Sequence, residues 1–496
     1  MNNLPFQLSF RPELPAIPNI YLASDYLYFR SVLIKIDDML HTSGLEDCLV
    51  GEALNTWLSK SKDLAEGQQI FRSKILHYAL RCNIARHLVE ETFRDFSIRL
   101  ADSELFQWFT RINGFDHKKA ASKSALDRYD KFFDAEMVDE QIKVYLAQLS
   151  DPVKACENIG LNNPISFSSV FMDTSCIKAN IHFPTDWVLL RDAARSLILA
   201  IKAIRKAGLK NRMIDPAIFM RNMNKLCIEM THTRRRADSK QKRKLILRRM
   251  KKLSCCIQKH AIRYKEMLQE RWQETDWTYN QAQQVIGRID NILQQLPAAI
   301  KQSHERIIGE RQVSSKDKIL SLYEPDAHVI VRGKAGGEVE FGNGLLLCEQ
   351  EDGIITHWQL FKDQPPSDSR LLKNAIIDIE RHYGKIDSAC TDRGFYSKKN
   401  EGFLKSRNIY DSMCPKSPKM LKERLQENKF QSLQSRRSQT EARIGIFKNS
   451  FIGRPLRSKG FNHKQLNVSW CVLTHNLWVI ARMALADEMS PLLKAA

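Results

Sequence analysis

Three carboxylate side chains occupy positions from which they can act together in chemistry. Asp173 lies inside the apolar segment SVFMDTSC, Asp392 ends the segment KIDSACTD, and Glu441 lies in the helical pattern SQTEARIGIFKNSF. Burying an ionised carboxylate costs free energy unless a cation or hydrogen-bond donors compensate for the lost water. Three such groups can hold two divalent ions about 3.5–4 Å apart, which stabilise the attacking and leaving oxygens of an in-line phosphoryl transfer.

Cationic side chains accompany these carboxylates. At 100° per helical residue, Arg437 and Lys448 lie within about 40° and 20° of Glu441, so the three share one face. Arg393 follows Asp392 in a predicted turn. Hard oxygen ligands with open water positions suit Mg²⁺, or Mn²⁺ in its place, better than zinc.

Each carboxylate also has an ordinary structural explanation. Asp173 can be a buried residue that accepts hydrogen bonds from a turn, and Glu441 can belong to an exposed helix with Arg–Glu pairs. Asp387 begins the segment that Asp392 ends, but it lies about 16 Å from it at 3.3 Å per residue, so we leave it out of the site. The three groups in combination favour catalysis over the structural explanations.

Positive charge is concentrated in two segments of the chain. The 496 residues carry a formal net charge of +20. Residues 231–265 hold 14 Lys and Arg against one acidic residue, and residues 401–460 hold 14 against five. Concentrated charge attracts polyanions, which favours nucleic acid over a solvated helix face. We expect Arg234, Arg235 and Arg236 of the first segment to contact DNA.

Composition excludes several classes of protein. Hydrophobic residues make up 43% and charged residues 27%, which is typical of a folded chain and not of a disordered or collagen-like one. We expect no membrane span and no signal peptide. The eleven cysteines form no C-x-x-C pair, so a reducing cytoplasm is expected.

Periodicity divides the chain into three regions. Residues 1–150 have helical spacing and predict an all-α N-terminal domain. Residues 167–186 and 317–486 alternate short β-rich runs with helices and predict an α/β core built on a mixed sheet. Residues 187–316 are helical again and contain the first basic segment, which predicts a basic helical insertion after the first core strand.

The motifs resemble those of one known family. MDTS around Asp173, TDRGFYS around Asp392 and RSQTEARIGIFK around Glu441 are similar to the DDE transposases of bacterial insertion sequences. The resemblance is to the branch with a Tyr-Arg-Glu-Lys signature, to which Arg437, Glu441 and Lys448 conform. Gln434 stands at the Tyr position. Residues 70–148, 168–180 and 318–485 share the resemblance.

The resemblance implies an RNase H-like core in which Asp173, Asp392 and Glu441 are catalytic and bind two Mg²⁺ ions. It implies nicking of the element end by water, followed by attack of the freed 3′-OH on target DNA. Arg437 and Lys448 would contact phosphates near the cleaved end. The implied partners are double-stranded DNA, as terminal inverted repeats and as target, and a second copy of the chain in a homodimer.

Several assignments stay open at the level of sequence. The segment SKSALDRYDKFF can be a recognition helix in DNA or an ordinary helix of the N-terminal bundle. Trp272 and Trp277 can stack on an unpaired base or pack in a core. The rival functions are a metal-dependent DNA nuclease without strand transfer and a catalytically inactive DNA-binding protein derived from a transposase.

Overall fold

The structure is a computed structural model that describes residues 11–17, 23–59, 65–112, 119–233, 238–334 and 337–495. Arg234, Arg235 and Arg236 lie outside these ranges. The chain divides into two compact units. The first comprises Met1–Ile177, Gly344–Phe361 and Pro365–Ala496, and the second comprises Lys178–Asn343 and Lys362–Gln364.

A mixed six-stranded sheet confirms the predicted α/β core. Its strands are β1 (Ser169–Lys178), β2 (His328–Lys334), β3 (Gly337–Glu349), β4 (Ile355–Leu360), β5 (Ser388–Thr391) and β6 (Tyr410–Met413). The order is β2-β3-β1-β5-β6, and β4 pairs with β3 beside β2. β1, β5 and β6 run parallel, while β2 and β4 are antiparallel to β3. This mixed sheet with flanking helices is consistent with an RNase H-like core.

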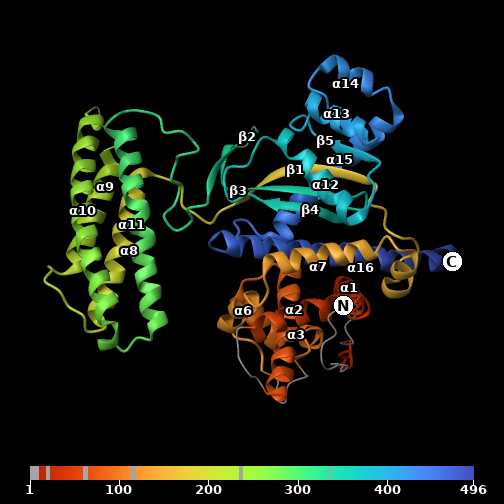
Figure 1. Ribbon diagram of the computed structural model, residues 1–496, viewed down its shortest axis with the longest axis horizontal. Coiled ribbons are helices and arrows are strands. Elements are labelled where there is room, and N and C mark those ends of the chain that lie inside the picture. The colour runs from red at the N-terminus through yellow and green to blue at the C-terminus, as the bar shows by residue number, and fades with distance from the viewer. Residues whose placement is uncertain are drawn as a thin grey trace. The chain divides into compact units, whose positions relative to one another are not determined.

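Helices cover both faces of the sheet in the first unit (Figure 1). Val170 and Met172 of β1 pack with the apolar residues of α12 (Leu372–Tyr383) and α13 (Lys398–Ser406). Phe171 points to the opposite face, where it packs with Leu433 of α15 (Asn428–Ile446). Successive strand residues alternate between faces, so the pattern SVFMDTSC is apolar on both. A further short helix, α14 (Pro418–Arg424), precedes α15.

The helix α16 (Phe461–Ala495) lies between the sheet and the N-terminal helices (Figure 1). Its Asn476 both donates to and accepts from the backbone of Ile355 in β4, at 2.8 and 2.9 Å. Residues Phe461–Glu488 are long and apolar enough to cross a membrane by length and composition, but 72% of the most apolar window is buried in the structure. The apolar character of α16 therefore reflects its place in the protein core.

Seven α-helices make up the described part of the N-terminal region. They share one continuous hydrophobic core with α16 and the adjoining strands, so this region is part of the first unit. Their bounds are α1 (Ser24–Thr42), α2 (Leu45–Ser59), α3 (Glu66–Leu88), α4 (Phe93–Asp102), α5 (Glu104–Phe109), α6 (Lys123–Asp130) and α7 (Ala135–Gln148). A π-helical turn at Lys154–Ile159 then leads toward β1.

A buried ionic network ties the N-terminal helices together. Arg81 on α3 is 2% exposed. Its Nε and Nη2 donate to the two carboxylate oxygens of Glu46 at 2.6 Å, and Nη1 donates to Asp37. Burial is the largest single influence and acts to raise the pKa of Glu46, but the charge and hydrogen bonds of Arg81, with the charges of His77 and Arg111, together lower it. The buried Glu46 carboxylate therefore depends on this guanidinium, whereas Asp37 is also paired with Arg11 and Arg111.

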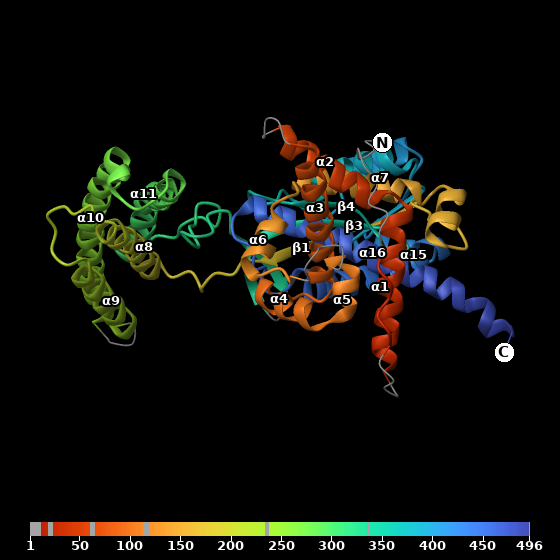
Figure 2. The same ribbon diagram turned by 90° about the horizontal axis from the view of Figure 1, so that it is seen from below.

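The second unit contains a four-helix bundle (Figure 2). Its helices are α8 (Asp186–Lys206), α9 (Pro216–Thr233), α10 (Ser239–Arg271) and α11 (Tyr279–Ile307). They enclose their own hydrophobic core, against which Trp272 and Trp277 pack as partly buried residues. Arg306 on α11 donates to both oxygens of Asp186 at 2.8 Å. This ion pair joins the start of the first helix of the bundle to the end of the last.

The Arg81 network makes a stability prediction. We expect Arg81→Met to lower the free energy of unfolding by about 3–5 kcal/mol, because it removes the cation from buried carboxylates. The midpoint of urea unfolding, followed by circular dichroism, measures the change. Arg99→Met is the control, since Arg99 is 47% exposed in its ion pair with Glu91 and should cost less than about 1 kcal/mol. Equal losses for the two variants would contradict the prediction.

Candidate active site

The pairing of two parallel strands brings Asp173 and Asp392 together. β1 and β5 are in register from Ser169 and Ser388 to Met172 and Thr391, and each aspartate is the next residue. Neighbouring parallel strands lie about 4.8 Å apart, and residues at matching register positions point to the same face. The two carboxylates therefore lie side by side at the edge of the sheet where β5 ends, midway along β1. Asp387, at the other end of β5, is exposed and away from this edge.

The helix α15 supplies the third carboxylate to the same face. Phe171 and Cys390, two positions before the aspartates, pack with Leu433 of α15. Glu441 lies two turns further along this helix and is exposed. Burial and the negative charge of Asp392 raise the pKa of Asp173 to about 6, with a smaller contribution from Glu441. This coupling shows that the three predicted carboxylates form one electrostatic cluster.

A fourth carboxylate, which the sequence did not single out, lies at the same edge. Asp368 accepts a hydrogen bond from Thr174 Oγ1 at 3.1 Å. A Cβ atom on Gly394 would come within 2.5 Å of Asp368 Oδ2 and 3.1 Å of Asp392 Oδ1. Only glycine leaves room here for the two acids to approach, which accounts for the Asp-Arg-Gly sequence after β5.

Backbone amides hold the two central aspartates. Asp173 Oδ1 accepts from the Thr174 N–H at 2.7 Å, and Asp392 Oδ1 accepts from the Gly394 N–H at 2.9 Å. Each carboxylate keeps a second oxygen for another ligand. The donor set is thus hard oxygen at a negatively charged edge, which fits a divalent cation.

The carboxylates of the cluster do not form a complete metal-ligand set in this structure. In the part of the chain that the structure describes, no three Asp, Glu, His or Cys side chains lie close enough to hold a metal ion as they stand. The carboxylates Asp173, Asp392 and Glu441 are the residues that could hold one. Completing such a ligand set requires side-chain movement.

Gln434 joins α15 to the ends of two strands. Its Nε2 donates to the carbonyl oxygens of Thr391 at 3.3 Å and Ser412 at 2.6 Å, and its Oε1 accepts from Arg437 Nε at 3.1 Å. Gln434 therefore fixes the helix beside Asp392 and orients the Arg437 guanidinium. The charge of Arg437 acts to lower the pKa of Asp173, so this cation lies near the cluster.

Arg436, which the sequence analysis passed over, holds the same helix to the turn between β3 and β4. It donates to the carbonyl oxygens of Glu351 at 2.7 Å and Gln350 at 2.9 Å, and to Glu349 Oε1 at 3.0 Å. Its guanidinium also lies 4.6 Å from the centre of the Phe171 ring. A planar group with five donors can fix a helix in this way, whereas a lysine cannot.

Lys448 takes a different place from the one its spacing suggests. The α-helix ends at Ile446 and continues as a π-helical turn over Phe447–Ile452. Lys448 is 6% exposed there, and its Nζ donates to Ser175 Oγ at 2.9 Å. Ser175 shares the β1 face of Asp173, so the wider turn brings the cation to the strand. Arg393, by contrast, is exposed in the turn after β5.

A basic stripe runs along α10 in the second unit. Its apolar residues face the bundle core, and Arg248, Lys252, Lys259 and Arg263 are exposed. At 100° per residue these four lie within about 60° of one another, and they extend over about 22 Å. These four cations therefore form one continuous, positively charged face of α10.

The raised pKa of Asp173 predicts a pH-dependent stability. Because the folded protein binds this proton more tightly than the unfolded chain, the carboxylate destabilises the fold above about pH 6, by up to about 3 kcal/mol. The penalty disappears as pH falls toward 4. We expect Asp173→Asn to melt at a higher temperature than wild type at pH 7.5 in EDTA, and the gap to close by pH 4.5.

Scanning fluorimetry between these pH values measures the gap. Added Mg²⁺ should raise the melting temperature of wild type and not of Asp173→Asn, because the ion neutralises this cluster. Asp387→Asn is the control and should follow wild type in both experiments. A pH-independent gap would show that the substitution acts through packing instead of charge.

The contacts of Gln434 predict a second effect. We expect Gln434→Leu to lower the free energy of unfolding by about 1–3 kcal/mol, because two carbonyls and the Arg437 guanidinium lose a partner. Gln431→Leu, at an exposed position one turn earlier, should be nearly neutral. Amide hydrogen exchange across α15 should rise only in the Gln434 variant. Unchanged exchange would remove Gln434 from the positioning contacts.

Comparison with known proteins bears on the same region. Residues 330–477 match the family described as Transposase DDE domain. No curated protein and no solved structure matches the chain. The matched region is less than a third of the chain. It contains Asp392 and Glu441, and it begins after β1, so Asp173 lies outside it. The match supports a DDE transposase. The register of β1 with β5 places Asp173 beside Asp392.

Proposed function

We propose that this protein is a transposase that cleaves DNA at the ends of its element and joins the freed 3′-OH to target DNA. The observation that supports it best is the convergence of Asp173 with Asp392 and Glu441, the last two of which lie in the region that matches a transposase domain. Transposases of this class generally use divalent metal ions.

Asp173, Asp392 and Glu441 would hold two Mg²⁺ ions, or Mn²⁺ in their place. The bound ions would supply Lewis acidity for phosphoryl transfer and lower the pKa of an attacking water or hydroxyl. The protein groups orient the reaction. Asp173 and Asp392 keep one oxygen on a backbone amide, so their free oxygens point to a defined place.

Arg437 would bind a phosphate beside the scissile bond, since Gln434 holds its guanidinium near the carboxylates. Arg393 would reach the DNA from the turn after Asp392. Lys448 would contact a phosphate only after its hydrogen bond with Ser175 opens, because it is buried in this structure. It holds the end of β1 in the DNA-free protein.

The finer family assignment is also a proposal. Arg437, Glu441 and Lys448 support the branch with the Tyr-Arg-Glu-Lys signature. At the Tyr position, Gln434 connects the helix to the strand ends through hydrogen bonds. We therefore expect a positioning role for Gln434 through its side-chain amide.

The remaining regions would bind DNA outside the catalytic edge. The N-terminal helices would bind the terminal inverted repeat, and the basic stripe of α10 would follow phosphates of the element end or of the target. Trp272 and Trp277 pack against the bundle core, which favours their structural assignment. Two element ends have to be cut together, so we expect a homodimer on DNA.

The two alternative functions differ from the proposed one in their effect on DNA. A nuclease would nick and not join, and an inactive derivative would bind and do neither. We expect wild-type protein with Mg²⁺ to nick a labelled duplex from the DNA flanking its gene, and then to join the 3′ end to a second duplex. Asp392→Asn should bind equally well and cleave at least about 10³-fold more slowly, since several kcal/mol of charge stabilisation are lost.

Asp387→Asn is the matched control, because it makes the same chemical change at the opposite end of β5. It should retain nicking and joining. Normal cleavage by Asp392→Asn would overturn the assignment of the site. Nicking without joining by wild type would establish the nuclease instead.

A further inference from the structure

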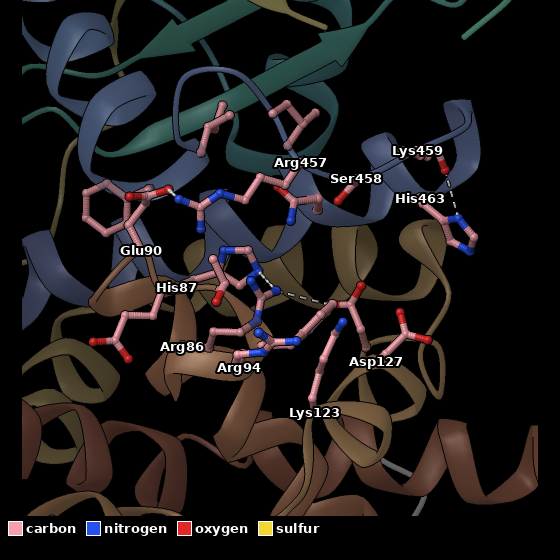
Figure 3. A pocket seen from close by; sticks show the side chains of 18 of the residues that line it. Arg86, His87, Glu90, Arg94, Lys123, Asp127, Arg457, Ser458, Lys459 and His463 are labelled. Carbon is pink, nitrogen blue, oxygen red and sulfur yellow. Dashed lines mark hydrogen bonds and ion pairs between the residues drawn. The ribbon is translucent and has the colours of Figure 1, made fainter. Parts of the chain in front are cut away.

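A cavity lies in the first unit, apart from the carboxylate cluster (Figure 3). It encloses about 630 Å³, within the range of about 300–1,000 Å³ that ligand pockets occupy. Its walls are the end of α3, the start of α4, the helix α6 and the segment 451–467 that follows the π-helical turn. Figure 3 shows Arg86, Arg94 and Lys123 on one side of the cavity and Arg457, Ser458 and Lys459 on the other.

The charges around the cavity do not cancel. Six Lys and Arg line it with four Asp and Glu, and each of these acids already has a cationic partner. Three of the cations form no ion pair within the described residues: Arg94, Lys123 and Lys459. They come from three separate elements and are exposed toward solvent. The positive charge of these three side chains therefore favours binding of an anion in the cavity.

A buried donor in the wall supports the same conclusion. Arg86 is 9% exposed, and its Nε has no hydrogen-bond partner within the structure as described. Its guanidinium lies 4.5 Å from the centre of the Phe93 ring and donates weakly to Asp130 at 3.4 Å. A buried N–H without a partner costs about 1–3 kcal/mol, and an acceptor in the cavity would recover that energy if a shift of the Arg86 side chain turned Nε toward it.

The neighbouring His87 adds no charge. It is 2% exposed, and burial together with the adjacent Arg86 charge lowers its pKa well below the usual value. Phe451, Ile452 and Leu456 complete an apolar wall. A ligand with a phosphate and an apolar or planar part fits such a cavity better than a simple ion.

We propose that this pocket binds a phosphodiester of the DNA strand on which the protein acts. Two connections favour DNA over a free phosphate. The helix α6 coincides with the segment that the sequence marks as a candidate recognition helix, and the segment 451–467 continues from the turn that carries Lys448. A strand seated here would contact both the N-terminal helices and the chain that leaves the catalytic edge. The proposal rests on the proposed function only for the identity of the DNA.

The test uses full-length protein without Mg²⁺ and a fluorescent duplex from the DNA flanking the gene. Arg94→Gln, Lys123→Gln and Lys459→Gln are combined in one variant. Each lost phosphate contact lowers the slope of log affinity against log salt by about 0.9. We expect the slope to fall by about 2 to 3 in this pocket variant, as measured by fluorescence anisotropy between 50 and 300 mM KCl.

The control combines Lys154→Gln, Arg381→Gln and Lys385→Gln, which remove the same charge from exposed positions of the same unit outside the pocket. Its slope should stay within about 0.5 of wild type. A second variant, Ser458→Trp, fills the cavity without changing its charge and should weaken DNA binding as well. Circular dichroism confirms that each variant is folded.

The outcomes separate the pocket from the catalytic proposal. If wild type binds DNA through the pocket but neither nicks nor joins it, the pocket stands and the transposase assignment falls. If wild type cleaves while pocket and control variants bind alike, the pocket proposal is overturned. A third measurement compares the melting temperatures of wild type and the pocket variant with and without thymidine monophosphate. If the nucleotide stabilises wild type but not the pocket variant, while both bind DNA alike, the pocket takes a small phosphate and not DNA.

Discussion

Holding three negative charges on one edge of a sheet is the constraint on which the first unit depends. Asp173 and Asp392 are adjacent through strand register, and Glu441 faces them from α15, so their mutual repulsion opposes the docking of this helix. The helix is held by contacts away from the charges. Gln434 binds the ends of β5 and β6, and Arg436 binds the turn after β3. The hydrogen bonds of these neutral and cationic side chains therefore offset the repulsion among the three carboxylates.

The π-helical turn after α15 extends this arrangement. A regular helix would carry Lys448 along the face of Glu441, whereas the wider turn directs it to Ser175 on β1. The same turn leads into the segment that lines the cavity. A single irregularity thus places Lys448 on β1 and leads into the wall of the basic pocket, so the two regions are joined by one continuous piece of chain.

The sequence predicted the elements of the core because hydrophobic periodicity is a local property. The strand around Asp173, the strand before Asp392 and the helix carrying Glu441 all lie where their patterns indicate, although α15 begins ten residues earlier than the segment we singled out. The helical character of residues 187–316 also follows from the sequence, since the buried stripe in α10 recurs at helical spacing. The residues that position the site were not, because Arg436 and Asp368 look like ordinary surface residues until distant segments meet.

Sequence by itself determined which residues can do chemistry: three carboxylates in a fixed order, with Arg437 and Lys448 spaced from the last. Side-chain chemistry and helical or strand period are properties of neighbours along the chain, and a string of letters contains them. Only the tertiary structure decided that Asp173 and Asp392 share a register, that Gln434 orients Arg437, and that Lys448 is buried. It alone revealed the cavity between α3, α4, α6 and the segment after the π-turn. These depend on contacts between residues hundreds of positions apart, which packing selects and local pattern does not encode.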